Sequence, residues 1–131
     1  MYAIEQQTLG FKLVFQGSIA ASEMQRWVED SKAALCNAPP SFGLFMDMRT
    51  LQPLPPESQT VMLVGQQLYQ RHGMRRSVVI VLSPITRMQF TRLAQESGIH
   101  QWERYISAES TPDWESKGWA WIQGGVDPDV S

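Results

Sequence analysis

The side chains best suited to chemistry lie in a short polar segment, Asp47-Met48-Arg49-Thr50, which follows an apolar run at residues 42–46. If that run is a strand of an open α/β sheet, the polar segment lies at its carboxyl end, where ligands and reactive groups gather in such sheets. Asp47, Arg49 and Thr50 are therefore candidate binding residues. The structural alternative is that the Asp47 carboxylate caps loop amides or pairs with Arg49.

A second candidate site follows the apolar run of residues 78–82. Ser83 is placed to cap a helix that begins at Pro84, and Arg87 comes one turn later. The first turn of a helix has free N–H groups, which can hold an anion when a cation lies nearby. Ser83 and Arg87 are thus candidate anion-binding residues, although an ordinary N-cap accounts for the same pattern.

No pattern in the sequence indicates catalysis, a cofactor or a metal ion. His72 and His100 are isolated and lack ligand spacing, and the chain has no glycine-rich phosphate-binding loop. Cys36, the single cysteine, falls near a predicted helix C-terminus, whereas thiolates are favoured at helix N-termini. We interpret it as a buried or half-buried residue without a catalytic role. We therefore predict a protein that is not an enzyme and has no cofactor or bound metal.

Tryptophans gather near the end of the chain, with Trp102, Trp114, Trp119 and Trp121 in its last thirty residues. On a helix that turns ~100° per residue, Trp114, Gly118 and Trp121 share one face, and Trp119 lies roughly 140° away. Trp114 and Trp121 are predicted core residues. Trp119 is predicted to be exposed, which makes it a candidate contact for a protein partner or an apolar ligand.

The hydrophobic pattern predicts the scaffold that positions these residues. The two apolar runs are too short for buried helices and are typical of strands covered on both faces. Alternating segments predict further strands, and helical spacing with capping residues predicts four helices. The expected strands are residues 2–7, 11–16, 42–48, 77–82 and 102–106, and the expected helices are residues 21–36, 56–72, 84–97 and 112–123. The expected inner faces are Val61, Val64, Gly65 and Leu68 in the second helix and Phe90, Leu93, Ala94 and Ser97 in the third.

The resulting order, β-β-α-β-α-β-α-β-α, predicts an α/β fold with a mixed sheet of about five strands. The first two strands form a hairpin through Thr8-Leu9-Gly10, and the hairpin strand lies at an edge. The strands at 42–48 and 77–82 are expected to be adjacent, parallel and central. The last strand carries Glu103 and Arg104, a polarity typical of an edge strand.

Length and composition predict one domain, residues 1–125, followed by a disordered tail, residues 126–131. The net charge of −2 gives no general attraction to nucleic acid. No apolar stretch approaches the ~20 residues of a transmembrane helix. A single cysteine and the lack of a signal peptide predict a cytoplasmic protein.

Three segments together resemble one known family. They are Phe45-Met46-Asp47-Met48-Arg49 with Leu51, residues 76–84, and Glu103-Arg104-Tyr105-Ile106 with Gly118-Trp119-Ala120-Trp121-Ile122. The set, and the order of the elements, resemble the anti-sigma-factor-antagonist (STAS) fold, above all its SpoIIAA-like branch of small bacterial proteins. The resemblance covers about residues 1–123. It implies a regulatory module that binds proteins, and the fold is also compared with lipid carriers of the Sec14 type.

One departure from that family concerns its phosphorylation switch. In switched members, the aspartate at the strand end is followed directly by Ser or Thr and a glycine-rich helix start. Here Asp47 is followed by Met48-Arg49-Thr50 and a proline-rich segment, residues 51–56. We therefore predict no regulatory phosphorylation at Thr50, Ser58 or Thr60.

These observations favour a non-enzymatic regulatory or interaction module that binds a second copy of itself or an unidentified protein. The alternative is a carrier or sensor of a small apolar or acyl ligand. It rests on five methionines, which can line adaptable pockets, namely Met46, Met48, Met62, Met74 and Met88. Neither function involves nucleic acid.

Overall fold

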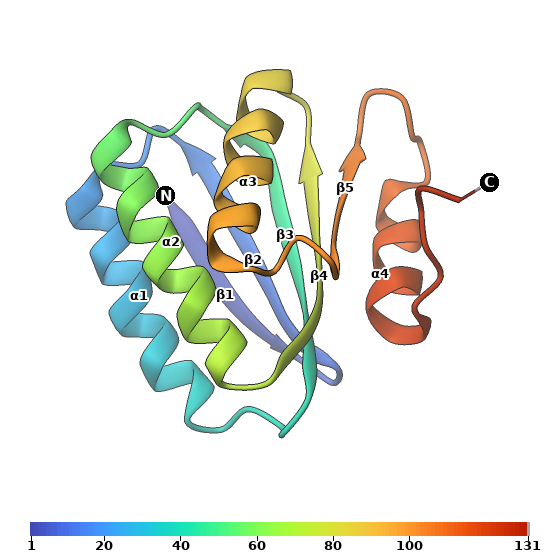
Figure 1. Ribbon diagram of the computed structural model, residues 1–131, viewed down its shortest axis with the longest axis horizontal. Coiled ribbons are helices and arrows are strands. Elements are labelled where there is room, and N and C mark those ends of the chain that lie inside the picture. Colours follow the sequence, from blue (N-terminus) through green and yellow to red (C-terminus); the bar gives the residue numbers. More distant parts are fainter. Residues whose placement is uncertain (131) are drawn as a thin grey trace.

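The predicted order of strands and helices is confirmed by the structure, a computed structural model that describes residues 1–130 (Figure 1). The boundaries lie within a few residues of the predicted ones. The elements are β1 (Tyr2–Gln7), β2 (Gly10–Gly17), α1 (Ala21–Leu35), β3 (Phe42–Leu51), α2 (Pro56–Arg71), β4 (Met74–Val81), α3 (Pro84–Ser97), β5 (Glu103–Ser107) and α4 (Trp114–Gly124).

The five strands form one sheet in the order β1-β2-β3-β4-β5. Strands β1 and β2 pair antiparallel as the predicted hairpin, and the other neighbours pair parallel. Gly10, with φ of 148°, supplies the unusual backbone conformation at the end of that turn. The hairpin strand at an edge and the adjacent, parallel β3 and β4 confirm the predicted topology.

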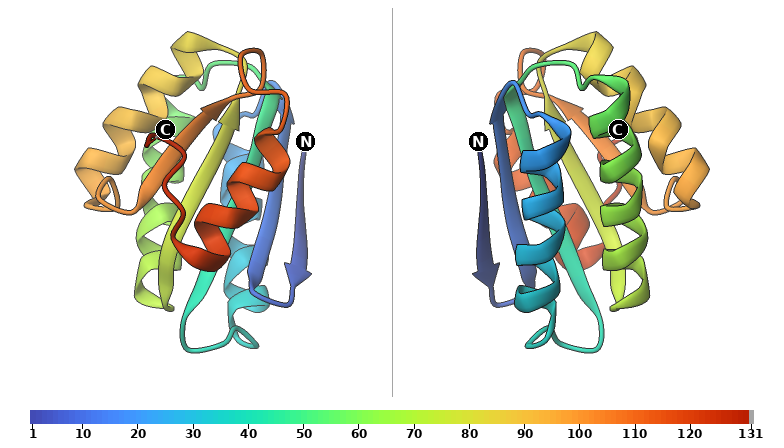
Figure 2. Two further views of the ribbon diagram at one scale, coloured as in Figure 1. Left: turned by 90° about the vertical axis from the view of Figure 1, so that its right-hand side faces the viewer. Right: turned by 90° about the vertical axis from the view of Figure 1, so that its left-hand side faces the viewer.

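Helices cover the two faces of the sheet unequally. Helices α1, α2 and α3 lie on one face, and α4 lies alone on the other (Figure 2). The alternation of side chains explains why residues 42–46 of β3 are all apolar. Leu44 and Met46 belong to the core beneath the three helices, and Phe45 belongs to the smaller core beneath α4.

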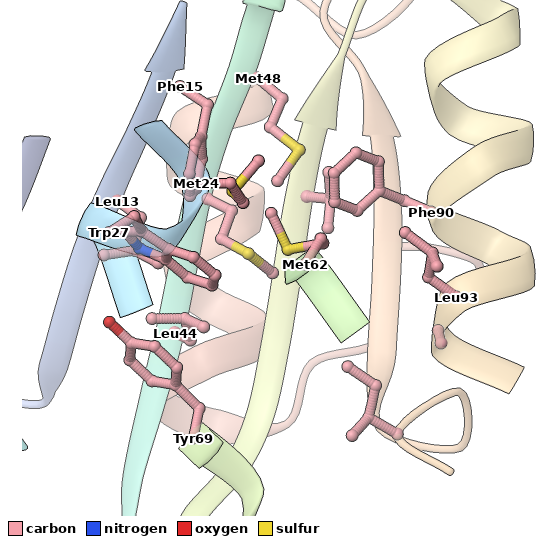
Figure 3. Packing of buried hydrophobic residues seen from close by; sticks show 14 of the residues in the cluster. Leu13, Phe15, Met24, Trp27, Leu44, Met48, Met62, Tyr69, Phe90 and Leu93 are labelled. Carbon is pink, nitrogen blue, oxygen red and sulfur yellow. The ribbon is translucent and has the colours of Figure 1, made fainter. Parts of the chain in front are cut away.

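The larger core contains most of the aromatic and methionine side chains. Trp27 stacks on Tyr69 with ring centroids 5.8 Å apart, and Met24, Met48 and Met62 fill the space between these rings and α3 (Figure 3). Four of the five methionines that suggested a carrier, Met46, Met48, Met62 and Met74, are buried in this cluster. They therefore serve as ordinary packing residues.

Helix α4 approaches the sheet closely because two glycines leave room at the contact. A Cβ on Gly118 of α4 would lie 2.5 Å from Cε2 of Phe45, and a Cβ on Gly43 of β3 would collide with Ile122. The absence of these two side chains lets Ile122 and Trp121 pack onto β3 and β4. This close packing holds α4 firmly against β3 and β4 on its face of the sheet.

Three local predictions are wrong. Helix α4 begins at Trp114 instead of Pro112, because residues 111–114 form a turn in which the Trp114 N–H donates to the Thr111 carbonyl at 3.1 Å. Val64, expected on the inner face of α2, is exposed, and Met62, Gly65 and Leu68 pack inward. Cys36 is exposed at the end of α1, where its thiol donates to the Lys32 carbonyl.

The residues after α4, predicted as a disordered tail, run back beside α4 and β5 in the described part of the chain (Figure 1). Asp127 accepts two hydrogen bonds from the Arg104 side chain, at 2.9 and 3.1 Å. The division into a domain and a tail stays a prediction. Among residues 1–130, no helix has the length and apolar character needed to cross a membrane.

Candidate functional site

The loops β3–α2, β4–α3 and β5–α4 all lie at the carboxyl edge of the parallel strands, at the top of Figure 1. This edge carries five of the six predicted site residues, Asp47, Arg49, Thr50, Ser83 and Arg87. They divide into two groups, one at the end of β3 and one at the start of α3. The two groups differ in how many of their polar atoms already have hydrogen-bond or ion-pair partners within the fold.

At the end of β3, Asp47 and Arg49 bind each other. The Arg49 Nε donates to Asp47 Oδ1 at 3.0 Å, its guanidinium donates to Oδ2 at 2.9 Å, and its backbone N–H donates to Oδ1 at 3.1 Å. Burial disfavours the carboxylate, but these contacts with Arg49 outweigh it and hold the pKa of Asp47 below its usual value. The guanidinium also lies over the Trp114 ring, 4.3 Å from its centroid.

The geometry at the end of β3 therefore agrees with a structural role for Asp47, as a cap and as a partner of Arg49. The Asp47 carboxylate is a cap and an ion-pair partner whose oxygens are occupied by a neighbour two residues away. Thr50 is exposed on the same strand. Whether any of these three residues binds a ligand stays a prediction.

The proline-rich loop after β3 is fastened to α3. The Leu54 N–H donates to Gln89 Oε1 at 2.8 Å, and Gln89 Nε2 donates to the Leu54 carbonyl at 3.1 Å. At the start of α2, Ser58 is fully buried and its hydroxyl donates to the Ile19 carbonyl at 2.7 Å. The loop and the first turns of α2 and α3 thus form one connected surface.

At the start of α3, Ser83 is confirmed as the N-cap, since its hydroxyl accepts from the Thr86 N–H at 3.2 Å. Three apolar side chains around this cap are exposed: Leu82 at 44%, Ile85 at 58% and Met88 at 71%. Ile85 and Met88 are three residues apart and so lie on one side of the helix. We call Leu82, Ile85 and Met88 the α3 patch.

A polar cavity of about 180 Å³ lies next to the patch, between the first turn of α3 and the β5–α4 connection. A smaller cavity of about 120 Å³ adjoins it and shares Arg87 and Ser107. In the described part of the chain, no methionine lines either cavity. The side chains around the larger one are mainly polar: Arg87, Tyr105, Ser107, Ser110, Thr111, Lys117 and Asp129, with Ile106 and Pro128.

A buried carboxyl group, Glu103, lies in β5 beneath α3. Its Oε1 accepts from the Ser77 hydroxyl at 2.9 Å, and its Oε2 lies 2.5 Å from the Tyr105 hydroxyl, which also lies 3.0 Å from the Phe90 carbonyl. Burial raises the pKa of Glu103 to about 7, against the opposing effect of the hydrogen bonds from Tyr105 and Ser77. The edge-strand pattern indicated an exposed Glu103, and the structure corrects this, because α3 covers this side of β5.

Trp119 is the one predicted site residue that lies elsewhere. It is half-buried instead of exposed, because its ring stacks on Phe45 with centroids 4.6 Å apart. Its remaining surface lines a cavity of about 230 Å³ with Leu9 and Gln123, beside the β1–β2 turn at the opposite edge of the sheet. Trp119 therefore cannot act together with Ser83 and Arg87.

Sequence reasoning missed Ile85 and Met88, although a signal was present. The inner face of α3 was predicted from Phe90, Leu93, Ala94 and Ser97, and at ~100° per residue Ile85 and Met88 fall on the other side of that helix. Apolar residues opposite a well-defined inner face indicate a contact surface.

Among solved structures, the chain is similar to the unphosphorylated form of the anti-sigma factor antagonist SpoIIAA. The sequence identity is 15%, the TM-score is 0.58, and the match covers 87% of this chain and 95% of that chain. No protein-family model and no curated protein sequence matches the chain. The protein therefore has the SpoIIAA-like fold of STAS domains, as the resemblance of its sequence predicted.

Proposed function

We propose that this protein is a regulatory protein-interaction module and that its protein partner binds at the α3 patch. The observation that carries the proposal is the exposure of Leu82, Ile85 and Met88 together at the start of one helix. Contiguous exposed apolar side chains are typical of interaction sites in proteins of this size. The fold supports the same class of function, because the protein it resembles is an anti-sigma factor antagonist.

The patch is held on a rigid support, which favours binding because little order is lost when a partner docks. Ser83 caps the helix beneath the patch, and Gln89 fastens the proline-rich loop to the next turn through two hydrogen bonds. Below them, Phe90 and Leu93 are buried in the larger core. A partner would therefore meet a preformed surface.

Binding at this patch is constitutive in our proposal, without a phosphorylation switch. The Ser58 hydroxyl is buried and donates to the Ile19 carbonyl, so a kinase could reach it only after local unfolding. Thr50 and Thr60 are exposed, but the Thr60 hydroxyl donates to a carbonyl of its own helix, that of Pro56. Phosphopeptide mapping of protein from its native cell tests this, and substantial occupancy at Thr50, Ser58 or Thr60 would contradict it.

The patch is tested by capture of a partner with tagged protein from native-cell extract. We expect a specific partner to be recovered with the wild type and lost with the double variant Ile85→Glu and Met88→Glu, because two buried charges at an interface cost several kcal/mol. The matched control is Val64→Glu with Val126→Glu, which adds the same charge at two other exposed apolar positions. A partner that stays with the patch variant and is lost with the control would contradict the proposal.

A second copy of the chain is the predicted alternative partner, and sedimentation velocity distinguishes it. A dimer that dissociates in the patch variant would make the α3 patch a self-association surface. The carrier function is tested by native mass spectrometry of freshly purified protein, since a retained acyl mass would support it. The burial of four methionines in the core gives that function no support.

A further inference from the structure

The polar cavity between α3 and the β5–α4 connection gathers hydrogen-bond donors that the fold itself does not use. Within residues 1–130, the hydroxyls of Ser107, Ser110 and Thr111 make no hydrogen bond to another protein group. The Arg87 guanidinium has no carboxylate partner in the same range and lies over the Tyr105 ring, 5.9 Å from its centroid. Such a set of free donors from separate elements requires acceptors from outside the chain or from water.

The charge around the cavity favours an anion. Arg87 and Lys117 bring two positive charges, and the nearest carboxylate to the Lys117 ammonium is Asp113 at 3.9 Å, beyond hydrogen-bond distance. Asp129 brings one negative charge, and its carboxylate lies 3.7 Å from Arg104 on the other side. The three charged side chains that line the cavity sum to one positive charge, and Asp113 beside Lys117 and Arg104 beside Asp129 lie outside this lining.

The size of the cavity limits what it can hold. Its volume of about 180 Å³ corresponds to roughly six liquid water molecules at ~30 Å³ each. The chain after α4 forms part of the cavity wall, because Arg104 holds Asp127, and the next two residues, Pro128 and Asp129, line the cavity. A tetrahedral oxyanion with a small organic group has the right size and presents the acceptors that these donors need.

We propose that this cavity binds a phosphate monoester, with Arg87 and Lys117 holding the phosphoryl oxygens and Ser107, Ser110 and Thr111 donating to those that remain. The site is separate from the α3 patch, and it does not depend on the proposed function. Asp129 opposes the bound anion and so weakens its binding. The phosphoryl group can come from a small metabolite or from a phosphorylated side chain, and the experiment distinguishes these sources.

The test is isothermal titration calorimetry of the full chain with three probes: inorganic phosphate, glycerol 3-phosphate and the peptide Ala-phosphoserine-Ala. We expect saturable binding of at least one phosphate monoester. Arg87→Gln and Lys117→Gln should each weaken it about tenfold or more, as expected for loss of a charge-assisted hydrogen bond. Arg92→Gln, an exposed arginine on the same helix outside this cavity, is the control and should change affinity less than twofold.

Asp129→Asn provides an opposite readout, since removal of its charge should tighten binding. The amide resonances of residues 107–111 should shift in the nuclear magnetic resonance spectrum of the wild type when the monoester is added. The proposal is overturned if no probe binds at millimolar concentration, or if Arg92→Gln weakens binding as much as Arg87→Gln. Preference for glycerol 3-phosphate over the peptide identifies a metabolite as the source, and the reverse identifies a phosphorylated protein.

Discussion

Two carboxyl groups buried in this sheet are held in opposite ways. Asp47, 7% exposed at the end of β3, is bound by a guanidinium, and its pKa is lowered. Glu103, 3% exposed in β5, is bound by hydroxyls alone within residues 1–130, and burial raises its pKa to about 7. Asp47 therefore stays charged, because a cation lies beside it, whereas Glu103 lies deeper in the protein with hydroxyl partners and carries a proton near neutral pH.

The same comparison separates structural polar groups from those available to a ligand. Arg49 is used by Asp47 and Trp114, whereas Arg87 has no carboxylate partner within residues 1–130. Both arginines lie at the carboxyl edge of the sheet, which is the usual place for ligands. Position alone therefore does not indicate function. Whether a polar group already has a partner within the fold must also be considered.

The largest loss of stability is expected when a third buried acid is added that has neither a guanidinium nor a hydroxyl partner. Val79 is fully buried and pairs in register with Tyr105, on the same side of the sheet as Glu103. Val79→Asp should cost about 4 kcal/mol or more and leave the protein unfolded at room temperature. Circular dichroism and urea titration measure this, with Val64→Asp at an exposed position of α2 as a control that should stay within about 0.5 kcal/mol of wild type.

The next effect is a pH dependence that originates at Glu103. Its pKa is about 7 in the folded protein, against an ordinary glutamate pKa of 4.5 in the unfolded chain, so folding binds a proton between these values. Its contribution to stability is present below pH 4.5 and is lost as pH rises through 7. The free energy of unfolding should therefore fall by about 3 kcal/mol from pH 4.5 to about 8.

Glu103→Gln is the matched variant for this pH dependence. Its amide can donate to the Tyr105 hydroxyl, which then donates to the Phe90 carbonyl, as a protonated glutamate would allow. The variant should lose this part of the pH dependence and be at least as stable as wild type at pH 8. Equal slopes for the two proteins in urea titrations across that range would show that Glu103 is ionised throughout.

A smaller effect of opposite sign is expected at Asp47. Its pKa in the folded protein lies below 3.8, the ordinary aspartate value, so its contribution is present above that value and is lost at lower pH. Asp47→Asn should cost about 1 kcal/mol at pH 7, a modest amount because the Arg49 side chain is 42% exposed. Chemical denaturation at pH 7 and below pH 3.8 measures the difference, which should shrink in acid. A difference that grows in acid would contradict the ion pair.

The smallest change in stability is expected at Arg87, the arginine compared above with Arg49. Since this guanidinium has no ion-pair partner among residues 1–130, Arg87→Gln should change the free energy of unfolding by less than about 0.5 kcal/mol. Thermal denaturation without phosphate checks this. A loss as large as that of Asp47→Asn would mean that Arg87 has a structural role.

The fold could be predicted from the sequence because its signals are local. The apolar runs around Phe45 and Val79, the Ser83-Pro84 cap and the glycine at the end of α3 each specify one element, and their order leaves few topologies. The unequal covering of the two faces was not predicted, because it depends on where α4 packs. The position of α4 depends on the contact between Gly118 and Phe45, which lie far apart in the sequence.

The site was predicted only in part, for a related reason. Sequence pattern placed Ser83 and Arg87 correctly at the start of α3. The exposure predicted for Glu103 and Trp119 was wrong. Strand alternation and helical spacing predict an exposed side chain wherever no packing partner is known. In the folded chain α3 covers Glu103, and Phe45 covers Trp119. The free donors of the cavity come from α3, β5, the β5–α4 connection and α4 together, so no single segment reveals them.

We propose that a protein partner binds at the α3 patch, while the end of β3 is occupied by the ion pair of Asp47 and Arg49. Hydrogen–deuterium exchange of the protein, free and bound to the partner recovered from native cells, tests this most directly. We expect binding to slow exchange in residues 82–92 and to leave exchange in residues 47–51 unchanged. Slower exchange at residues 47–51 or around Trp119, with none in residues 82–92, would contradict it.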